Sequence, residues 1–172
     1  MNFNDLAAKR YSVRLFAEKE VEKDKLEYVL RAGQLAPTAV NYQPQRILVI
    51  KDRQARARLR ECTQYHFNAP VSLLVCSHNE KAWNRPFDGK NSGEIDCSIV
   101  TTQMMLAAAD IGLGTTWIMY FDPAKIREAF NIPPSLEPVA LLVMGYPAED
   151  AVPGPKHAQR KPLEETVFYN TF

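Results

Sequence analysis

Residues 94–111 have the sequence EIDCSIVTTQMMLAAADI, the longest helical pattern in the chain. Their apolar side chains recur at helical spacing in two separate stripes. One stripe comprises Ile95, Ile99, Thr102, Leu106 and Ala109, and the other comprises Cys97, Val100, Met104, Ala108 and Ile111. A helix that is apolar on two sides is buried on two sides. Because a chain of 172 residues is most simply one domain, we expect a subunit interface to cover one of these sides.

The segments after this helix predict a strand, a short helix and a second strand. Glycines in residues 112–114 end the long helix, and residues 115–119 have the pattern of a strand. The pair Asp122-Pro123 is typical of a helix N-cap and first turn. A proline-rich turn over residues 131–138 then precedes an aliphatic core strand at residues 139–144.

The segments before the long helix alternate between helix and strand. The spacing of apolar residues predicts helices over residues 3–9, 21–36 and 53–62. Continuous aliphatic runs predict strands over residues 46–51 and 71–76, each buried on both faces. This pattern is compatible with a parallel or an antiparallel sheet.

Two exposed segments flank the second of these strands. The helix at residues 53–62 carries four arginines without interleaved aromatic residues, which favours a solvated basic face over a nucleic-acid site. Residues 78–93 are polar and include Trp83 and Pro86, which predicts a long surface loop. Loops of this length in a compact domain are usually functional or mobile.

The short cluster Arg10-Tyr11-Ser12-Val13-Arg14 follows the first predicted helix. Guanidinium groups bind phosphate bidentately and stay charged at any working pH. The Ser12 hydroxyl and neighbouring main-chain N–H groups can donate to the same anion. Alone, such a pair of arginines near a helix end is more often a solvated surface feature.

The stretch Ala36-Pro37-Thr38-Ala39-Val40-Asn41-Tyr42-Gln43-Pro44 predicts a stiff loop, because two prolines restrict it. It exposes the polar side chains of Thr38, Asn41 and Gln43. One interpretation is a plain connection from helix to strand. The other is a preformed wall of hydrogen-bond donors and acceptors for a polar ligand.

Residues 150–172 predict a C-terminal arm without a core of its own. A basic group at residues 156–161 is followed by the aromatic residues Phe168, Tyr169 and Phe172. So much apolar surface on a tail predicts packing against another surface, and we expect that surface to belong to a partner subunit.

Composition excludes several classes of protein. A net charge of +1 argues against a field that gathers nucleic acid or an anionic membrane. No aliphatic run is long enough to span a bilayer, and no signal-peptide pattern is present. Cys62, Cys76 and Cys97 are odd in number and widely spaced, which is typical of reduced thiols in a cytoplasmic protein. We expect residues 1–172 to form a single domain.

With these motifs in view, the chain resembles the nitroreductase family of flavin-dependent oxidoreductases over nearly its whole length. The resemblance rests on five blocks in the same order, each weak alone. They are residues 10–16, 36–44, 112–123 (GLGTTWI and FDP), 145–149 (GYPAE) and 160–165 (RKPLEE). It implies an α+β fold with a mostly antiparallel sheet flanked by helices, and an intertwined homodimer that binds two FMN molecules at its interface.

The family's site residues can be transferred to matching positions. Arg10, Ser12 and Arg160 resemble the residues that bind the phosphate of FMN, and Arg14 resembles the cation beside the ribityl chain or the N1–O2 edge of the flavin. The loop with Thr38, Asn41 and Gln43 resembles the wall supplied by the other subunit. Main-chain N–H groups near Ile118, Met119 and Tyr120 correspond to those facing flavin N5. The resemblance extends the cofactor-binding set to Tyr11, Pro37, Ala39, Thr116, Trp117 and Lys161.

Two positions depart from the family pattern. Met119 and Tyr120 stand where small glycines are frequent, which would narrow the substrate pocket. Ala158 stands where some members have a basic residue, so Arg160 would hold the phosphate with fewer neighbours.

The resemblance implies no catalytic side chain, because the flavin performs the difficult step. It implies ping-pong turnover in which NADH or NADPH reduces FMN and a nitroaromatic, a quinone or a similar acceptor then oxidises it. Trp83, Trp117 and Tyr120 are candidates for stacking, although core packing is the more frequent role of such residues. The three histidines lack metal-ligand spacing, so we expect no metal site. A flavin-binding protein without turnover and a nucleic-acid-binding module are the alternatives.

Overall fold

A four-stranded antiparallel sheet lies at the centre of the structure, a computed structural model that describes residues 2–172. Its strands are β1 (Gln45–Ile50), β2 (Val71–His78), β3 (Gly114–Ile118) and β4 (Leu136–Gly145), in the spatial order β1-β2-β4-β3. Every neighbouring pair is antiparallel. The expected α+β fold with an antiparallel sheet is therefore confirmed.

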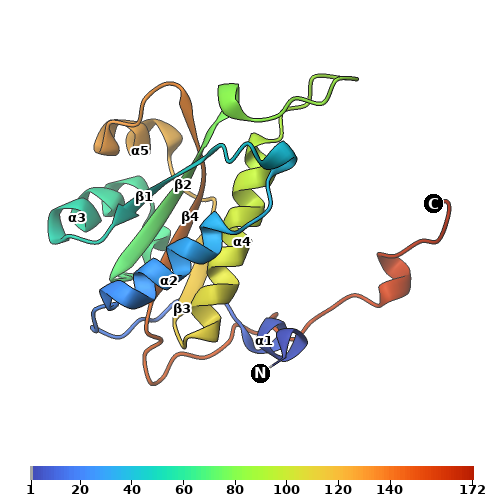
Figure 1. Cartoon of the computed structure of the whole chain (residues 1–172). Helices are drawn as coiled ribbons and strands as arrows, with labels where there is room; N and C mark the ends of the chain where they lie inside the picture. Colours follow the sequence, from blue (N-terminus) through green and yellow to red (C-terminus); the bar gives the residue numbers. More distant parts are fainter. Residues whose placement is uncertain (1) are drawn as a thin grey trace.

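Helices cover both faces of the sheet (Figure 1). The helices are α1 (Phe3–Lys9), α2 (Lys23–Gln34), α3 (Arg53–Cys62), α4 (Gly93–Asp110) and α5 (Pro123–Phe130), of which α1 packs against α4 and the other four lie on the sheet. Odd-numbered residues of β2 pack with α2 and α4, whereas even-numbered residues pack with α3 and α5. This alternation follows from the two-residue period of a strand. It explains why residues 73–76 of β2 are apolar without interruption.

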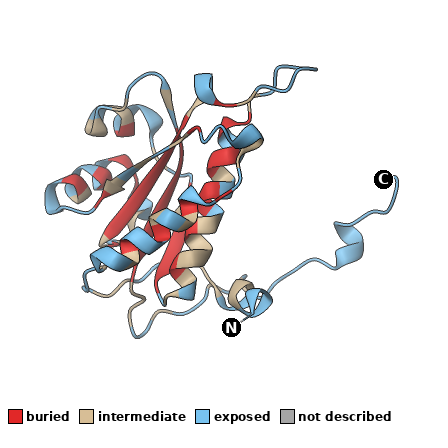
Figure 2. Cartoon of the chain, in the orientation of Figure 1, coloured by how far each residue is buried: buried red, intermediate tan, exposed pale blue. Residues whose placement is uncertain are grey.

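The two central strands form the most deeply buried part of the molecule (Figure 2). Leu73 of β2 pairs with Leu142 of β4, and both side chains are fully buried. Burial of a leucine side chain contributes about 1.5–3 kcal/mol each relative to exposure. The central pair therefore fixes the position of β3, which is the edge strand beyond β4.

Two details of the sheet differ from the sequence-based prediction. Strand β1 is not buried on both faces: Leu48 is 39% exposed, because an edge strand has a neighbouring strand on one side only. Strand β4 begins at Leu136, inside the predicted turn, and includes Pro138. The β2–β4 register shifts between Val75 and Cys76, which is typical of a β-bulge. Pro138, which has no N–H, is tolerated there because the hydrogen-bond ladder is already interrupted.

Helix α4 buries only one of its two apolar stripes within the chain. Val100 and Met104 are fully buried against the sheet and α2. Helix α2 approaches closely at Gly33, where a Cβ atom would lie 2.7 Å from Met104 Cγ. On the opposite side, Ile95 is 50% exposed and Ile99 is 37% exposed. We call the stripe Ile95, Ile99, Thr102 and Leu106 the open stripe of α4.

Residues 151–157 still contact the N-terminal segment, and the chain then extends away from the body (Figure 1). Every residue from 158 to 172 is exposed, including Phe168 and Phe172, whose rings lie 5.3 Å apart. Such an arm has no packing partner within residues 2–172 for most of its apolar surface. Across the same residues, no helix has both the length and the apolar character needed to cross a membrane.

Candidate functional site

The N-terminal segment that contains the two arginines lies along the outer edge of β3. Ser12 forms a parallel bridge with Thr115, and the Val13 N–H donates to the Thr115 carbonyl at 2.9 Å. The buried Thr116 hydroxyl donates to the Val13 carbonyl. Gly114 makes this approach possible, since a Cβ there would lie 2.5 Å from a Val13 methyl group. These contacts hold the segment in register beside the sheet.

The C-terminal segment meets the same edge. The Tyr11 hydroxyl donates to the Ala151 carbonyl at 3.2 Å, across 140 positions of sequence. The Tyr11 ring packs edge-on against His157, with ring centroids 6.1 Å apart. Segments from near both ends of the chain are thereby joined beside β3.

A basic hollow opens between these two segments, with a volume of about 460 Å³. No acidic residue lines it. We call it the cationic hollow, and its lining residues are Arg10, Ser12, Arg14, Gly154, Pro155, Lys156, His157 and Arg160. Three guanidinium groups and an ammonium group around one cavity suit an anion with more than one charge.

The main chain of the tail orients Arg160 within this hollow. Its Nη1 donates to the carbonyls of His157 and Gln159 at 2.6 and 2.7 Å. Arg14 Nη1 donates to the Ser12 carbonyl at 3.3 Å. Because a guanidinium has five N–H donors, both arginines keep donors for a ligand.

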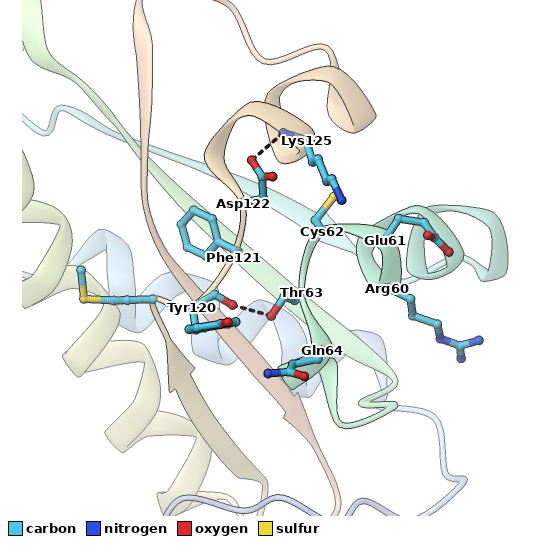
Figure 3. A pocket seen from close by; sticks show the side chains of 10 residues that line it. Arg60, Glu61, Cys62, Thr63, Gln64, Tyr120, Phe121, Asp122 and Lys125 are labelled. Carbon is cyan, nitrogen blue, oxygen red and sulfur yellow. Dashed lines mark hydrogen bonds between the residues drawn. The ribbon is translucent and has the colours of Figure 1, made fainter.

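A second hollow, of about 620 Å³, lies just beyond the end of β3 (Figure 3). Met119 and Tyr120 line it and are 64% and 66% exposed. The Thr63 hydroxyl donates to the Tyr120 carbonyl, and the Tyr65 ring packs edge-on against the Tyr120 ring at 5.1 Å. We call it the β3-end hollow. About 17 Å of extended backbone joins it to the cationic hollow along β3.

The β3-end hollow also contains the Cys62 thiol. Burial, together with the nearby charge of Asp122, raises the pKa of Cys62 above its ordinary value. Its Sγ donates to the Arg58 carbonyl at 3.4 Å. Burial and this hydrogen bond disfavour the thiolate, which is the nucleophilic form of a cysteine.

The loop of residues 36–44 is strained and rigidly held. Val40, Asn41 and Gln43 adopt left-handed backbone angles, with φ of 53°, 56° and 51°. For a β-branched residue such as Val40 this conformation is a genuine outlier. The Gln43 N–H donates to the Thr38 hydroxyl at 3.1 Å. Strain of this kind persists at functional sites, where the surrounding structure enforces it.

Asp96 anchors this loop, and sequence analysis missed it. It is 1% exposed in the first turn of α4, where one carboxylate oxygen accepts from the Ala39 N–H at 2.8 Å. The other oxygen accepts from the Ser92 hydroxyl at 2.7 Å. The available signal was its position, directly between Ile95 of one apolar stripe and Cys97 of the other.

The loop and the cationic hollow lie at opposite ends of α4. Ala39 is bound to Asp96 in the first turn, whereas Arg10 and Tyr11 line a small cavity with Ala109 at the last turn. From residue 96 to residue 109 the helix rises about 20 Å. A single chain therefore does not bring Pro37, Thr38, Ala39, Asn41 and Gln43 to the arginines.

Three further positions in the expected set lie away from the cationic hollow. Trp117 is partly buried against the core on the α2–α4 side of the sheet, and Ile118 is buried on the α3–α5 side. Lys161 is exposed and forms an ion pair with Glu165 at 3.4 Å. What the structure gathers in one place is Arg10, Ser12, Arg14 and Arg160.

Comparisons with known proteins agree on one family. A family model described as "Nitroreductase family" matches residues 7–67 and 62–146. The crystal structure of a nitroreductase family protein from Clostridium difficile 630 superposes with a TM-score of 0.94 at 45% identity, covering 100% of both chains. A putative NADH dehydrogenase/NAD(P)H nitroreductase from Methanothermobacter thermautotrophicus is 30% identical over 82% of this chain and 75% of its own. An FMN-dependent nitroreductase from Clostridium difficile R20291 has a TM-score of 0.76 at 25% identity, covering 97% and 98% of the two chains.

Proposed function

The chain belongs to the nitroreductase family, and from this premise we propose that it is an FMN-dependent oxidoreductase that works as a homodimer. NADH or NADPH donates the electrons. Nitroaromatics, quinones or similar electron-poor molecules accept them. One observation carries this proposal: the cationic hollow, in which Arg10 and Arg160 from distant parts of the chain line the same cavity.

The residues of the cationic hollow fit the phosphate of FMN. A phosphate monoester carries close to two negative charges, and Arg10, Arg160 and the Ser12 hydroxyl offer donors to it. Charge-assisted hydrogen bonds of this type contribute about 1.5–3 kcal/mol each. The lack of an acidic lining residue removes the main source of repulsion.

When bound, FMN supplies the hydride chemistry, accepting a hydride from the nicotinamide and passing it to the acceptor in a separate half-reaction. The protein binds and orients the cofactor. Arg14 lies in the same hollow, and its fixed positive charge favours the reduced, more negative form. The exposed residues Met119 and Tyr120 border an open hollow that one substrate can leave before the next enters. This sequence of events gives ping-pong kinetics.

A second copy of the chain completes the site. The open stripe of α4 offers an apolar face for a two-fold interface. Packing two α4 helices in opposite directions brings the loop of residues 36–44 of one subunit to the cationic hollow of the other. Parallel packing would instead place loop against loop. The arm of residues 150–172 packs on the partner in this assembly, which accounts for its exposed aromatic residues.

The three cysteines support a cytoplasmic location, since all of them are free and buried. Burial raises the pKa of Cys76 to about 11 and that of Cys97 to about 12, so both remain thiols.

The absorbance spectrum of the purified protein tests the proposal. We expect flavin bands that bleach when NADH or NADPH is added without oxygen and return when menadione is added. Protein that retains no FMN after incubation and gel filtration would contradict flavin binding. Protein that retains FMN but does not bleach with either nucleotide would be a binder without turnover.

A further inference from the structure

Two side chains of the β3-end hollow carry positive charges without a partner among residues 2–172. Arg60 lies near the end of α3, and Lys125 lies in the first turn of α5. Both are exposed, and neither side chain forms a hydrogen bond or an ion pair within these residues. Figure 3 shows Lys125 extending beside Cys62 and Arg60 extending outward from the rim. We call Arg60 and Lys125 the rim cations.

Other basic residues on the same side of the sheet are engaged with their own chain. Arg127 of α5 forms an ion pair with Glu137 of β4. Arg56 Nη2 donates to the Asn68 carbonyl at 3.0 Å. These side chains stabilise the fold, whereas the rim cations keep all their N–H donors for a ligand.

The two acidic residues of the hollow leave the rim cations in excess. Asp122 is the N-cap of α5, and its carboxylate accepts from the N–H groups of Ala124 and Lys125 at 2.9 and 3.1 Å. The positive end of the helix dipole therefore offsets its charge. Glu61 is exposed and forms no ion pair within the described chain. One negative charge thus remains against the two rim cations.

Positive charge also extends from the hollow along α3. Arg53, Arg56 and Arg60 follow one another at helical spacing on one side of this helix. Burial and the charges of Arg60 and Arg56 lower the pKa of His66, which follows α3. A row of like charges that leads to a hollow raises the local concentration of an anionic substrate.

The contents of the β3-end hollow indicate which kind of anion it receives. The exposed ring of Tyr120 lines the hollow and offers a surface on which an aromatic base can stack. Its volume of about 620 Å³ is within the usual range for small-molecule sites, about 300–1,000 Å³. Phosphate groups joined to aromatic rings are the chemistry of a nucleotide. In the proposed function the cationic hollow is taken by FMN, so the nucleotide here is a different one.

We propose that Arg60 and Lys125 bind the phosphate groups of the reduced nicotinamide dinucleotide. The β3-end hollow then holds the phosphorylated part of the electron donor, and the nicotinamide ring lies toward the flavin. This inference rests on the proposed function and deepens it, because it names residues that recognise the donor. Acceptors such as menadione have no phosphate, so their binding does not depend on the rim cations.

Anaerobic bleaching of the FMN-loaded protein separates binding of the donor from hydride transfer. The dependence of the bleaching rate on NADPH concentration gives an apparent Kd and a limiting rate. For the double variant Arg60→Ala with Lys125→Ala, we expect the apparent Kd to rise about three- to twentyfold, as for loss of two exposed charge pairs. The limiting rate should stay the same. With 1-benzyl-1,4-dihydronicotinamide, a donor without phosphate, the double variant and the wild type should behave alike.

Two further variants control for folding and for general charge. Lys51→Ala with Arg53→Ala removes the same kinds of charge about 10 Å away along α3 and should change the apparent Kd much less. Glu61→Gln removes the remaining acid and should lower the apparent Kd for NADPH. Added salt should weaken NADPH binding more in the wild type than in the rim-cation variant, because salt screens exposed charges.

A comparison of NADPH with NADH identifies the phosphate that is bound. An equal rise in apparent Kd for both donors assigns the rim cations to the pyrophosphate. A rise confined to NADPH assigns them to the 2′-phosphate. Either result supports the inference.

The remaining outcomes separate this inference from the proposed function. An unchanged apparent Kd for NADPH, or equal weakening of the donor without phosphate, overturns the role of the rim cations while flavin binding and turnover stand. A wild-type protein that binds no FMN, or whose flavin no donor bleaches, overturns the proposed function itself.

Discussion

The two ends of helix α4 differ in how much of a binding site each one supplies. At its last turn, Arg10, Ser12, Arg14 and Arg160 form a cationic hollow entirely within one chain. At its first turn, a strained loop and a projecting hairpin (residues 82–92) lie about 20 Å from that hollow along the helix. In the proposed dimer, the last turn of α4 supplies the anion site and the first turn contributes to the site of the partner. Four substitutions test this contrast, in order of decreasing effect.

The largest effect is expected at the proposed dimer interface, where opposite ends of two α4 helices lie side by side. Ile99→Arg places a charge in the open stripe of α4, and an uncompensated charge in an interface costs about 3–5 kcal/mol. We expect the dimer to dissociate and flavin retention to fall with it, as measured by sedimentation and by flavin absorbance. Ala57→Arg, on the exposed side of α3, should leave both unchanged. A monomer that keeps its FMN would show that one end alone is sufficient.

The second-largest effect is expected at the cationic hollow, beside the last turn of α4. Arg10→Ala removes one partner of a charged hydrogen bond, and we expect FMN binding to weaken by roughly 2–4 kcal/mol. Isothermal titration of the flavin-free protein measures the change. Arg53→Ala, which removes an equal charge from the far side of the sheet, provides the reference. If the Arg10 variant binds FMN with unchanged affinity, the phosphate of FMN does not bind in the cationic hollow.

A smaller effect is expected at Asp96, which anchors the loop of residues 36–44 to the first turn of α4. Asp96→Ala leaves the Ala39 N–H and the Ser92 hydroxyl without their acceptor, which should lower the free energy of unfolding by roughly 1.5–3 kcal/mol. Urea denaturation measures this loss. Asp110→Ala, at the exposed last residue of the same helix, should cost much less. If both variants lose the same stability, Asp96 has no special role in holding the loop.

The smallest effect tests the strain in the loop. Val40→Gly allows the left-handed angle without a Cβ clash, and we expect the protein to gain about 1 kcal/mol after the entropic cost of glycine. FMN should bind more weakly to this variant because the loop of residues 36–44 is less rigid. Thermal unfolding and flavin titration measure the two changes. A less stable variant would mean that Val40 makes contacts worth more than its strain.

Much of the fold was predictable because its signals are local. The periodicity of residues 94–111 gave the long helix and its two apolar sides, and the cap at Asp122-Pro123 gave the start of α5. The direction of the strands was not local information and came from the family resemblance. Pro138 was assigned to a turn because its tolerance depends on a bulge in the pairing with β2, which no single segment reveals.

The candidate site was predictable in part for the same reason. Arginines near Ser12 are a visible motif, but their meeting with Arg160 requires the parallel bridge of Ser12 to Thr115 and the contact of Tyr11 with His157. These are tertiary contacts between distant segments. Asp96 escaped notice because its role is to accept hydrogen bonds from a loop, and the partner atoms are main-chain groups that every sequence has.

Because residues 10–14 and residues 154–160 line the same hollow, the site is completed late during synthesis on the ribosome. While Arg160 is still untranslated or inside the exit tunnel, a nascent chain can already have formed its sheet. It then has only the N-terminal half of the cationic hollow. If the cationic hollow binds the phosphate of FMN as proposed, the affinity of the nascent chain for FMN is therefore lower until Arg160 has left the exit tunnel.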